Sequence, residues 1–162
     1  MHGVELRRGS VEDVPAALAV QRAAFTVEAS LYEDPDLPPL RESEADIVAD
    51  LASSTWFVAL LDGRLVGSVR VRSEGRSLHI GRLSVAPEAQ RRGIGAALLT
   101  LAETAAPADE AVLFTGHLSA GNLRLYARAG YVEERRERVD DAVVLVHLRK
   151  ELTATPPAEP RT

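Results

Sequence analysis

The stretch that decides the fold is Leu83-Ser84-Val85-Ala86-Pro87-Glu88-Ala89-Gln90-Arg91-Arg92-Gly93-Ile94-Gly95-Ala96-Ala97-Leu98-Leu99. Its beginning predicts a β-strand that ends at Pro87, because proline has no N–H to donate to a neighbouring strand. Gly93 and Gly95 precede a run of alanines and leucines that favours a helix. We therefore expect a strand, a glycine loop and a helix to follow one another here.

A junction of this kind can bind an anion. The first turn of a helix carries unpaired N–H groups and the positive end of the helix dipole, and glycine lets a phosphate approach the backbone. The alternative is a plain strand–turn–helix in which the glycines only permit a positive φ. The loop is not a Walker loop, because no Gly-Lys-Ser/Thr follows, and it lacks the third small residue of the dinucleotide fingerprint.

The loop resembles the acyl-CoA pyrophosphate loop of the GNAT superfamily of N-acetyltransferases. The pattern of that family is Gln or Arg, two residues, Gly, one residue, then Gly or Ala, and the matching segment here is Gln90-Arg91-Arg92-Gly93-Ile94-Gly95. The resemblance implies acetyl-CoA as co-substrate and no metal. It also implies that backbone N–H groups from Arg91 to Ala96 hold the pyrophosphate, with added positive charge from Arg91 and Arg92.

A second motif lies downstream, in Asn122-Leu123-Arg124-Leu125-Tyr126-Ala127-Arg128-Ala129-Gly130-Tyr131. Asn122 and Tyr126 are four positions apart and share one helix face, so an amide and a phenol could reach one ligand. Local helix chemistry alone makes Tyr126 a core-edge residue and Gly130 a C-terminal cap. GNAT proteins carry a matching element, and this resemblance implies that Asn122 contacts the pantetheine arm while Tyr126 protonates the departing CoA thiolate.

The family resemblance also assigns roles to the strand before the loop. It implies that the backbone at Leu83 and Val85 bonds the pantetheine and the thioester oxygen. His79 precedes Val85 by six residues, is expected on the same strand face, and is the candidate base, because an imidazole pKa near ~6.5 suits proton removal from an amine. Several family members place a glutamate there. The alternative is a strand histidine satisfied by a neighbour, and His117 is a weaker second candidate.

The bulk composition describes an ordinary globular protein. The chain has 162 residues, of which 46% are apolar and 27% charged, so we expect a single domain over residues 1–152 followed by a disordered tail over 153–162. It has no cysteine, which excludes disulfides and thiolate chemistry, and its net charge of −5 argues against nucleic acid as a partner. No segment has the character of a signal peptide or a membrane span, so we expect a cytoplasmic protein.

Hydrophobic patterning and turn signals predict seven strands and about four helices. Their order matches that of GNAT proteins over roughly residues 4–150. The expected fold class is therefore α+β, with a mixed, mostly antiparallel sheet in which the fourth and fifth strands are parallel and splayed. The expected strands are 4–8, 56–61, 65–72, 78–85, 111–115, a strand from 131 onward and 142–148, and the expected helices are 11–25, 42–51, 96–106 and 122–129, with a loop over 26–40.

The acceptor of the acetyl group is less well determined. The segment expected to form its wall is rich in acidic residues, namely Glu28, Glu33, Asp34, Asp36, Glu42, Glu44 and Asp46. They form either a solvated surface loop or a wall that attracts a cationic acceptor such as a polyamine. We expect direct acetyl transfer to a primary amine of a small molecule or peptide. Alternatives are a longer acyl-CoA, a non-catalytic acyl-CoA sensor and an unrelated nucleotide-binding domain; homodimers are common among similar proteins.

Overall fold

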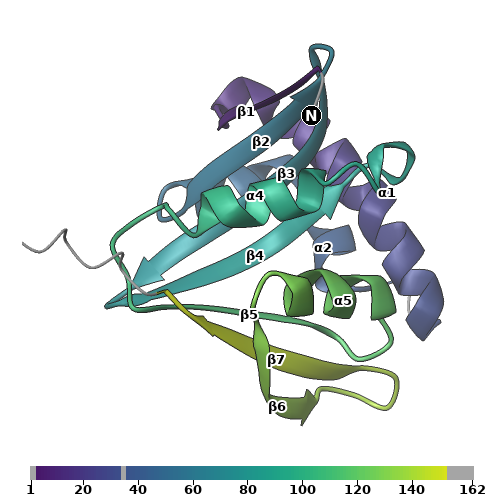
Figure 1. Ribbon diagram of the computed structural model, residues 1–162. Coiled ribbons are helices and arrows are strands. Elements are labelled where there is room, and N and C mark those ends of the chain that lie inside the picture. Colours follow the sequence, from purple (N-terminus) through teal and green to yellow (C-terminus); the bar gives the residue numbers. More distant parts are fainter. Residues whose placement is uncertain (1–2, 34–35, 153–162) are drawn as a thin grey trace, which may run out of the picture.

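The structure is a computed structural model that describes residues 3–33 and 36–152; the tail expected over 153–162 lies outside them. The strands are β1 (Val4–Arg8), β2 (Thr55–Leu61), β3 (Arg64–Glu74), β4 (Ser77–Val85), β5 (Glu110–Gly116), β6 (Val132–Arg138) and β7 (Val144–Glu151). They form one seven-stranded sheet in the order β1-β2-β3-β4-β5-β7-β6 (Figure 1). Only β4 and β5 pair in parallel, so the expected mixed, mostly antiparallel α+β fold is confirmed.

The parallel strands β4 and β5 separate after a short paired segment. Their register runs from Ser77 opposite Glu110 to His79 opposite Val112 and then stops. Beyond that point β4 remains paired with β3, and β5 remains paired with β7 as far as Gly116. The expected splay of the fourth and fifth strands is thus present, and it opens toward the carboxyl ends of both strands.

A β-bulge in β4 changes which face its residues occupy. Ser84 lies opposite Ser68 and Gly81 lies opposite Arg70, so β4 carries one more residue than β3 in this interval. The bulge includes Arg82, whose φ is 53°. Because side chains alternate with a period of two, the extra residue places Val85 on the opposite face from His79. The expectation that these two residues share a strand face was wrong.

The helices surround the sheet at predicted places but with different limits. They are α1 (Val14–Tyr32), α2 (Pro38–Arg41), α3 (Glu44–Leu51), α4 (Ile94–Ala102) and α5 (Ala120–Arg128), with short 3-10 turns η1 (Val11–Asp13) and η2 (Pro87–Ala89). The helix expected to end at residue 25 continues to Tyr32, because Pro35 restricts only the residues close before it. Glu33 then ends α1 in the left-handed conformation, with φ 52°. Among the described helices, none is long and apolar enough to cross a membrane.

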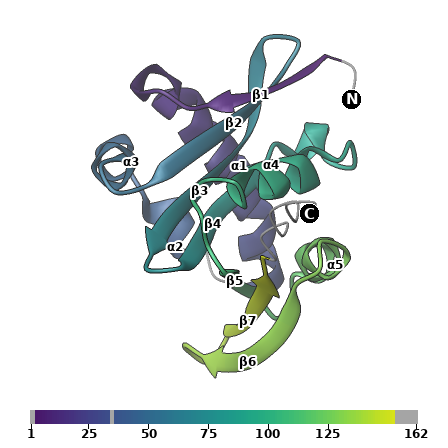
Figure 2. The same ribbon diagram turned by 60° about the vertical axis from the view of Figure 1, so that its left-hand side comes forward.

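The helices form a layer on each face of the sheet (Figure 2). On one face, Val14 and Leu18 of α1 and Ile47 of α3 pack with Trp56 and Val58 of β2. On the other face, α4 packs into the main core, and its large fully buried side chains are Ile94, Leu98 and Leu99. Each such side chain contributes roughly 1.5–3 kcal/mol by leaving water. The loop between β4 and α4 is therefore held at both ends by buried elements.

Candidate active site

The glycine loop ends in an open helix N-terminus. Gly93 is the N-cap of α4 with φ 78°; among the described residues no side-chain cap hydrogen bond is found there, and the first turn of α4 contains no acidic residue. Arg91 also has a positive φ, 66°. The first N–H groups of α4 thus lack both intrahelical acceptors and a capping side chain. The exposed side chains of Arg91 and Arg92 flank them, so the residues present suit a phosphate group.

The loop is packed against the end of β4 and against α5. A Cβ added to Gly95 would lie 3.4 Å from Leu125 Cδ2 and 3.7 Å from Val85 Cγ2, which are ordinary contact distances, so the start of α4 lies beside α5 and the end of β4. The Gln90 side-chain amide donates to the Val85 carbonyl oxygen at 3.3 Å. Ile94 is buried beneath the loop, whereas Ala96 is exposed in the first turn. The structure therefore brings the predicted loop residues together with Val85.

The backbone of β4 turns hydrogen-bonding groups toward the gap between β4 and β5. The Ala86 N–H donates to the Val66 carbonyl at 2.8 Å and so faces β3. Because successive residues of a strand turn their polar groups to opposite sides, the N–H and C=O of Val85 face away from β3. The same alternation gives Leu83 this direction. These groups point to the side where β5 has moved away.

Asn122 and Tyr126 lie on α5, as predicted, beside the end of β5. The Asn122 amide donates to Thr115 Oγ1 at 3.3 Å and to Glu28 Oε1 at 3.5 Å. The Tyr126 ring is buried and meets Tyr131 edge-on, with ring centroids 6.0 Å apart. Within residues 3–33 and 36–152, no hydrogen-bond partner of the Tyr126 hydroxyl is found. Burial and the nearby Glu28 carboxylate raise the pKa of Tyr126, so the phenol remains protonated.

Sequence analysis missed a polar cluster that joins α1 to the β5–α5 connection. Tyr32 accepts from the Leu118 N–H at 2.9 Å, and its hydroxyl lies 3.0 Å from Ser119 Oγ. Ser119 in turn donates to Glu28. A Cβ at Gly116 would lie 2.0 Å from the Tyr32 hydroxyl, so only glycine permits this contact. These residues were missed because the helix was expected to end before Glu28; the four-residue spacing of Glu28 and Tyr32 was the available signal.

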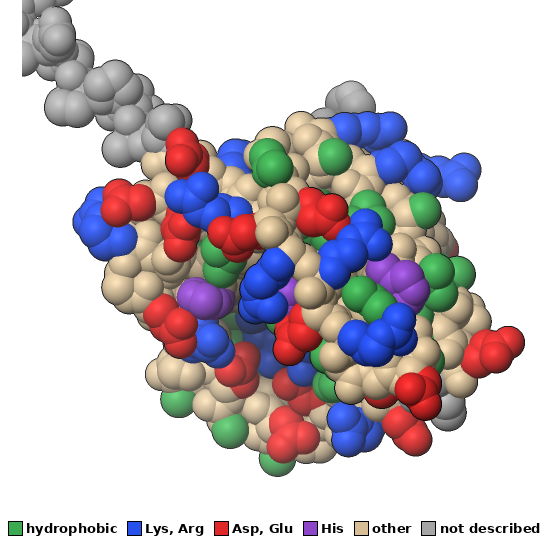
Figure 3. Space-filling view, turned by 90° about the horizontal axis from the view of Figure 1, so that it is seen from below, with side chains coloured by type: hydrophobic (Ala, Val, Ile, Leu, Met, Phe, Trp, Pro, Cys, Tyr) green, Lys and Arg blue, Asp and Glu red, His purple; other side chains and the backbone are tan. Residues whose placement is uncertain are grey.

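His79 lines a cavity of about 540 Å³ that extends from the gap across the α3 side of the sheet. A space-filling view of the underside of the molecule shows a hollow bordered by charged side chains (Figure 3). His79 Nε2 lies 3.0 Å from Glu74 Oε2, and its side chain is 38% exposed. His117 is not among the residues that line this cavity, as far as the described chain shows. Its Nδ1 lies 3.2 Å from both the carbonyl oxygen and the N–H of Val144.

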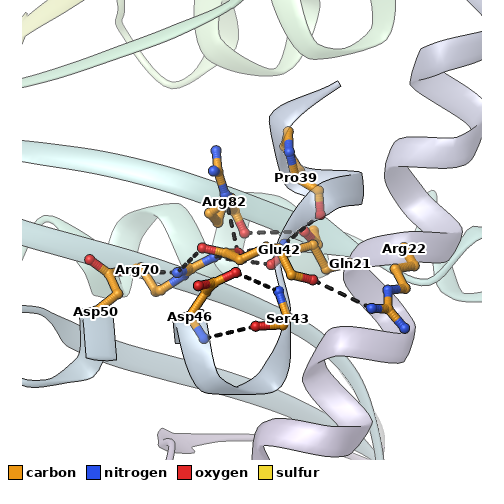
Figure 4. Close-up of polar contacts among 10 residues, drawn as sticks. Gln21, Arg22, Pro39, Glu42, Ser43, Asp46, Asp50, Arg70 and Arg82 are labelled. Carbon is orange, nitrogen blue, oxygen red and sulfur yellow. Dashed lines mark hydrogen bonds and ion pairs between the residues drawn. The ribbon is translucent and has the colours of Figure 1, made fainter. Parts of the chain in front are cut away.

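Glu42 forms the centre of an ion network at the base of the cavity (Figure 4). Arg70 binds it through two bonds, Nη2 to Oε1 at 2.6 Å and Nη1 to Oε2 at 3.1 Å. Gln21 Nε2 donates to Oε1 at 2.8 Å, and Arg82 Nε lies 3.5 Å from the same oxygen. Burial alone would raise the pKa of Glu42, but the bonds from Arg70 and Gln21 and the arginine charges lower it to about 2. Glu42 is therefore an anion whose charge is already compensated.

Asp46 and Glu28, two further residues of the expected acidic wall, are also engaged. Asp46 accepts from the Ser43 N–H at 2.9 Å in the capping box that begins α3. Glu28 bonds Ser119 and Asn122, as described above. Three of the acidic residues thus serve contacts within the protein, which weakens the expectation of a wall selective for cations.

Comparison with known proteins identifies the family. The family model described as acetyltransferase (GNAT) domain matches residues 40–152. The PaiA N-acetyltransferase of Thermoplasma acidophilum, solved in complex with coenzyme A, has a TM-score of 0.73 and 18% identity, covering 92% of this chain and 99% of that one. The ribosomal-protein-S18-alanine N-acetyltransferase of Escherichia coli has a TM-score of 0.76 and 16% identity, covering 98% and 99%.

A third solved structure, yncA of Salmonella typhimurium with its cofactor acetyl-CoA, has a TM-score of 0.71 and 16% identity, covering 97% of this chain and 99% of that one. No curated protein sequence matches the chain. At these identities the solved structures establish the fold, and the family model establishes the relationship. The chain is an acetyltransferase that belongs to the GNAT family.

Proposed function

We propose that the protein transfers the acetyl group of acetyl-CoA directly to a primary amine of a small molecule or peptide, within one ternary complex. The observation that carries this proposal is the open gap between β4 and β5, which lies between the uncapped N-terminus of α4 and the free phenol of Tyr126. Structural neighbours solved with coenzyme A or acetyl-CoA support the choice of co-substrate.

In this proposal the glycine loop holds the pyrophosphate. The N–H groups from Arg91 to Ala96 donate to it, and the helix dipole and the Arg91 and Arg92 side chains add favourable charge. Gln90 supports the loop through its bond to Val85. The proposed pyrophosphate-binding residues are Gln90, Arg91, Arg92, Gly93, Ile94, Gly95 and Ala96.

Acetyl-CoA supplies the activated acetyl group, and the chain holds and polarises it. The gap-facing backbone of Leu83 and Val85 bonds the pantetheine and the thioester oxygen, where an N–H donor stabilises developing negative charge. The side-chain amide of Asn122 contacts the pantetheine arm. Holding the thioester and amine together supplies up to ~7–11 kcal/mol of the barrier reduction.

The reaction needs two proton transfers, which take place on opposite faces of the sheet. His79, in the cavity, takes a proton from the acceptor ammonium so that a neutral amine can attack the thioester carbon. Glu74, 3.0 Å from the ring, orients the imidazole. Tyr126 donates its phenolic proton to the leaving thiolate, and the proton that the attacking nitrogen loses as the amide forms restores the phenol. Its raised pKa keeps the phenol protonated until the thiolate appears.

Ligand binding and turnover together test the proposal. Thermal shifts are measured with acetyl-CoA, coenzyme A, ATP and NAD, because a ligand that binds only the folded state raises its apparent stability. Thiol release is then followed with a panel of amines. We expect shifts with the two coenzyme A forms and amine-dependent release. Binding without turnover would indicate a sensor, and shifts with ATP or NAD alone would contradict the proposed co-substrate.

A further inference from the structure

The cavity beside the β4–β5 gap is lined by four arginines and by the carboxylates of Glu42, Asp50 and Glu134. Its arginines are Arg70, Arg72, Arg82 and Arg135. The carboxylates at its base, Glu42 and Asp50, both bind Arg70: Glu42 through two hydrogen bonds and Asp50 through Oδ2 at 3.0 Å from Nη1. The carboxylates nearest Arg82 are therefore already bonded to the guanidinium of Arg70.

Among residues 3–33 and 36–152, the guanidinium of Arg82 has no hydrogen-bond acceptor. Its one close anionic contact places Nε 3.5 Å from Glu42 Oε1, and the Nε atom is shielded from solvent. In the part of the chain that the structure describes, no acceptor is found for any N–H of this guanidinium. Figure 4 shows Arg82 above the Glu42 carboxylate, whereas Asp50 lies to the left, beyond Arg70. A buried donor without a partner is costly, so an acceptor supplied by a ligand would be favoured here.

The electrostatic surroundings of Arg82 also favour an added anion. Burial lowers the pKa of Arg82, Glu42 partly offsets this, and the nearby charge of Arg70 lowers it further. Arginine nevertheless remains protonated in proteins. A planar guanidinium with a free fork of N–H donors matches the geometry of a carboxylate, which it binds through two parallel bonds.

Arg82 lies where an acceptor must approach. It occupies the bulge of β4, between His79 and the gap-facing backbone of Leu83. Across the cavity stand residues of β5, including Val112 and Phe114. An anionic group held by Arg82 would therefore lie close to the place where the amine attacks.

We propose that the acceptor is a small amine that also bears a carboxylate, as an amino acid does, and that Arg82 binds this carboxylate. The inference rests on the proposed acetyl transfer and specifies its substrate class. It replaces the cationic acceptor that the acidic residues of the sequence suggested. Glu42 is one of those residues, and Arg70 already neutralises its charge.

The first test compares each standard amino acid with its α-amide as acceptor, using thiol release from acetyl-CoA with the unmodified protein. The two members of a pair differ in the charge of one group. We expect the acids that react to exceed their amides in kcat/KM by roughly ten- to hundredfold, the range for a hydrogen bond to a charged group.

The second test removes the guanidinium. In Arg82→Gln we expect KM for the acid to rise and the preference for acid over amide to fall at least about tenfold, with KM for acetyl-CoA unchanged. The matched control is Arg76→Gln. Arg76 is an exposed arginine just before β4 that pairs with Asp109 outside the cavity, and its loss should leave the preference intact.

Three results would overturn the inference. One is equal or better use of amides, or of amines without a carboxylate, by the unmodified protein. Another is a folded Arg82→Gln variant that retains the acid preference. The third is that no amino acid reacts. Thermal shifts with acetyl-CoA in the same samples show separately whether the proposed co-substrate binds, so the two proposals can fail independently.

Discussion

Tyr126 combines a buried ring with a hydroxyl that has no bond to give up among the described residues. Because the substitution would leave no described hydrogen-bond partner unsatisfied, Tyr126→Phe should change the unfolding free energy by less than about 1 kcal/mol. Loss of the proton donor should lower kcat about a hundredfold or more while leaving KM for acetyl-CoA unchanged. Steady-state kinetics and thermal melting measure the two effects. Unaltered kcat would mean that a water molecule protonates the thiolate.

His79 is tested through the pH dependence of the rate. If its imidazole is the base, kcat/KM should fall on acidification, and His79→Gln should lose this acid limb of the profile. His147→Gln is the matched control, because His147 lines the same cavity and pairs with Glu137 at 2.9 Å. An identical profile in His79→Gln would remove His79 from the mechanism.

At the residue level, spacing predicted some of the site and failed where the backbone departs from regular geometry. Asn122 and Tyr126 were placed on one helix correctly, since a four-residue spacing depends only on helix periodicity. The relation between His79 and Val85 was wrong, because alternation holds only in an uninterrupted strand and a bulge follows Gly81. A glycine inside a strand can mark such a bulge, so Gly81 was the available signal. The partners of Glu28 depend on tertiary packing and were not predictable from local sequence.

Among the elements, the β4–α4 loop can be compared with the β3–β4 turn, since each contains a glycine with a positive φ. Gly93 and Gly75 both have positive φ, 78° and 60°. Replacing either by Val should cost about 1–3 kcal/mol of stability through backbone strain. Only Gly93→Val should also weaken coenzyme A binding, at least about tenfold, because it redirects the N–H donors of the α4 N-terminus. Calorimetric titration with coenzyme A and melting curves distinguish the two variants. Equal binding by both would contradict a pyrophosphate site at this loop.

The elements themselves were largely predictable, and the exceptions have physical causes. Strands such as β2 and β3 were recognised because apolar runs flank the Asp62-Gly63 turn. The extent of α1 was underestimated, since a loop was expected over 26–40, a segment with prolines at 35, 38 and 39. Proline disturbs only the turn before it. The longer helix brings Glu28 and Tyr32 to the end of β5.

For the whole molecule, the proposed coenzyme site and the proposed base lie on opposite faces of the sheet. α4 and α5 on one face carry the coenzyme loop and Tyr126, while the cavity with His79 opens on the face covered by α1 and α3. The gap between β4 and β5 is where the two sides meet. The network around Glu42 holds the second face in place, because it joins Gln21 of α1 and Asp50 of α3 to Arg70 of β3.

This network predicts how stability depends on pH. The pKa of Glu42 is lowered from its ordinary value of 4.5 to about 2 in the folded state. A lowered folded pKa gives stability that is present above 4.5 and is lost as pH falls toward 2. The loss should amount to about 3 kcal/mol in the free energy of unfolding. Asp13 adds to it, because hydrogen bonds from Arg7 lower the pKa of Asp13 to about 2.

Urea denaturation of the unmodified protein and of Glu42→Gln between pH 7 and pH 2 separates this contribution. The variant should be less stable at pH 7 by about 3–5 kcal/mol, since Arg70 loses a bidentate partner in a buried site. Its stability should fall less steeply than that of the unmodified protein below pH 5, because only Asp13 of this pair still titrates. Glu44→Gln, an exposed change on the neighbouring α3, should preserve the full acid dependence. Parallel curves for the unmodified protein and Glu42→Gln would show that the network does not hold the cavity face to the sheet.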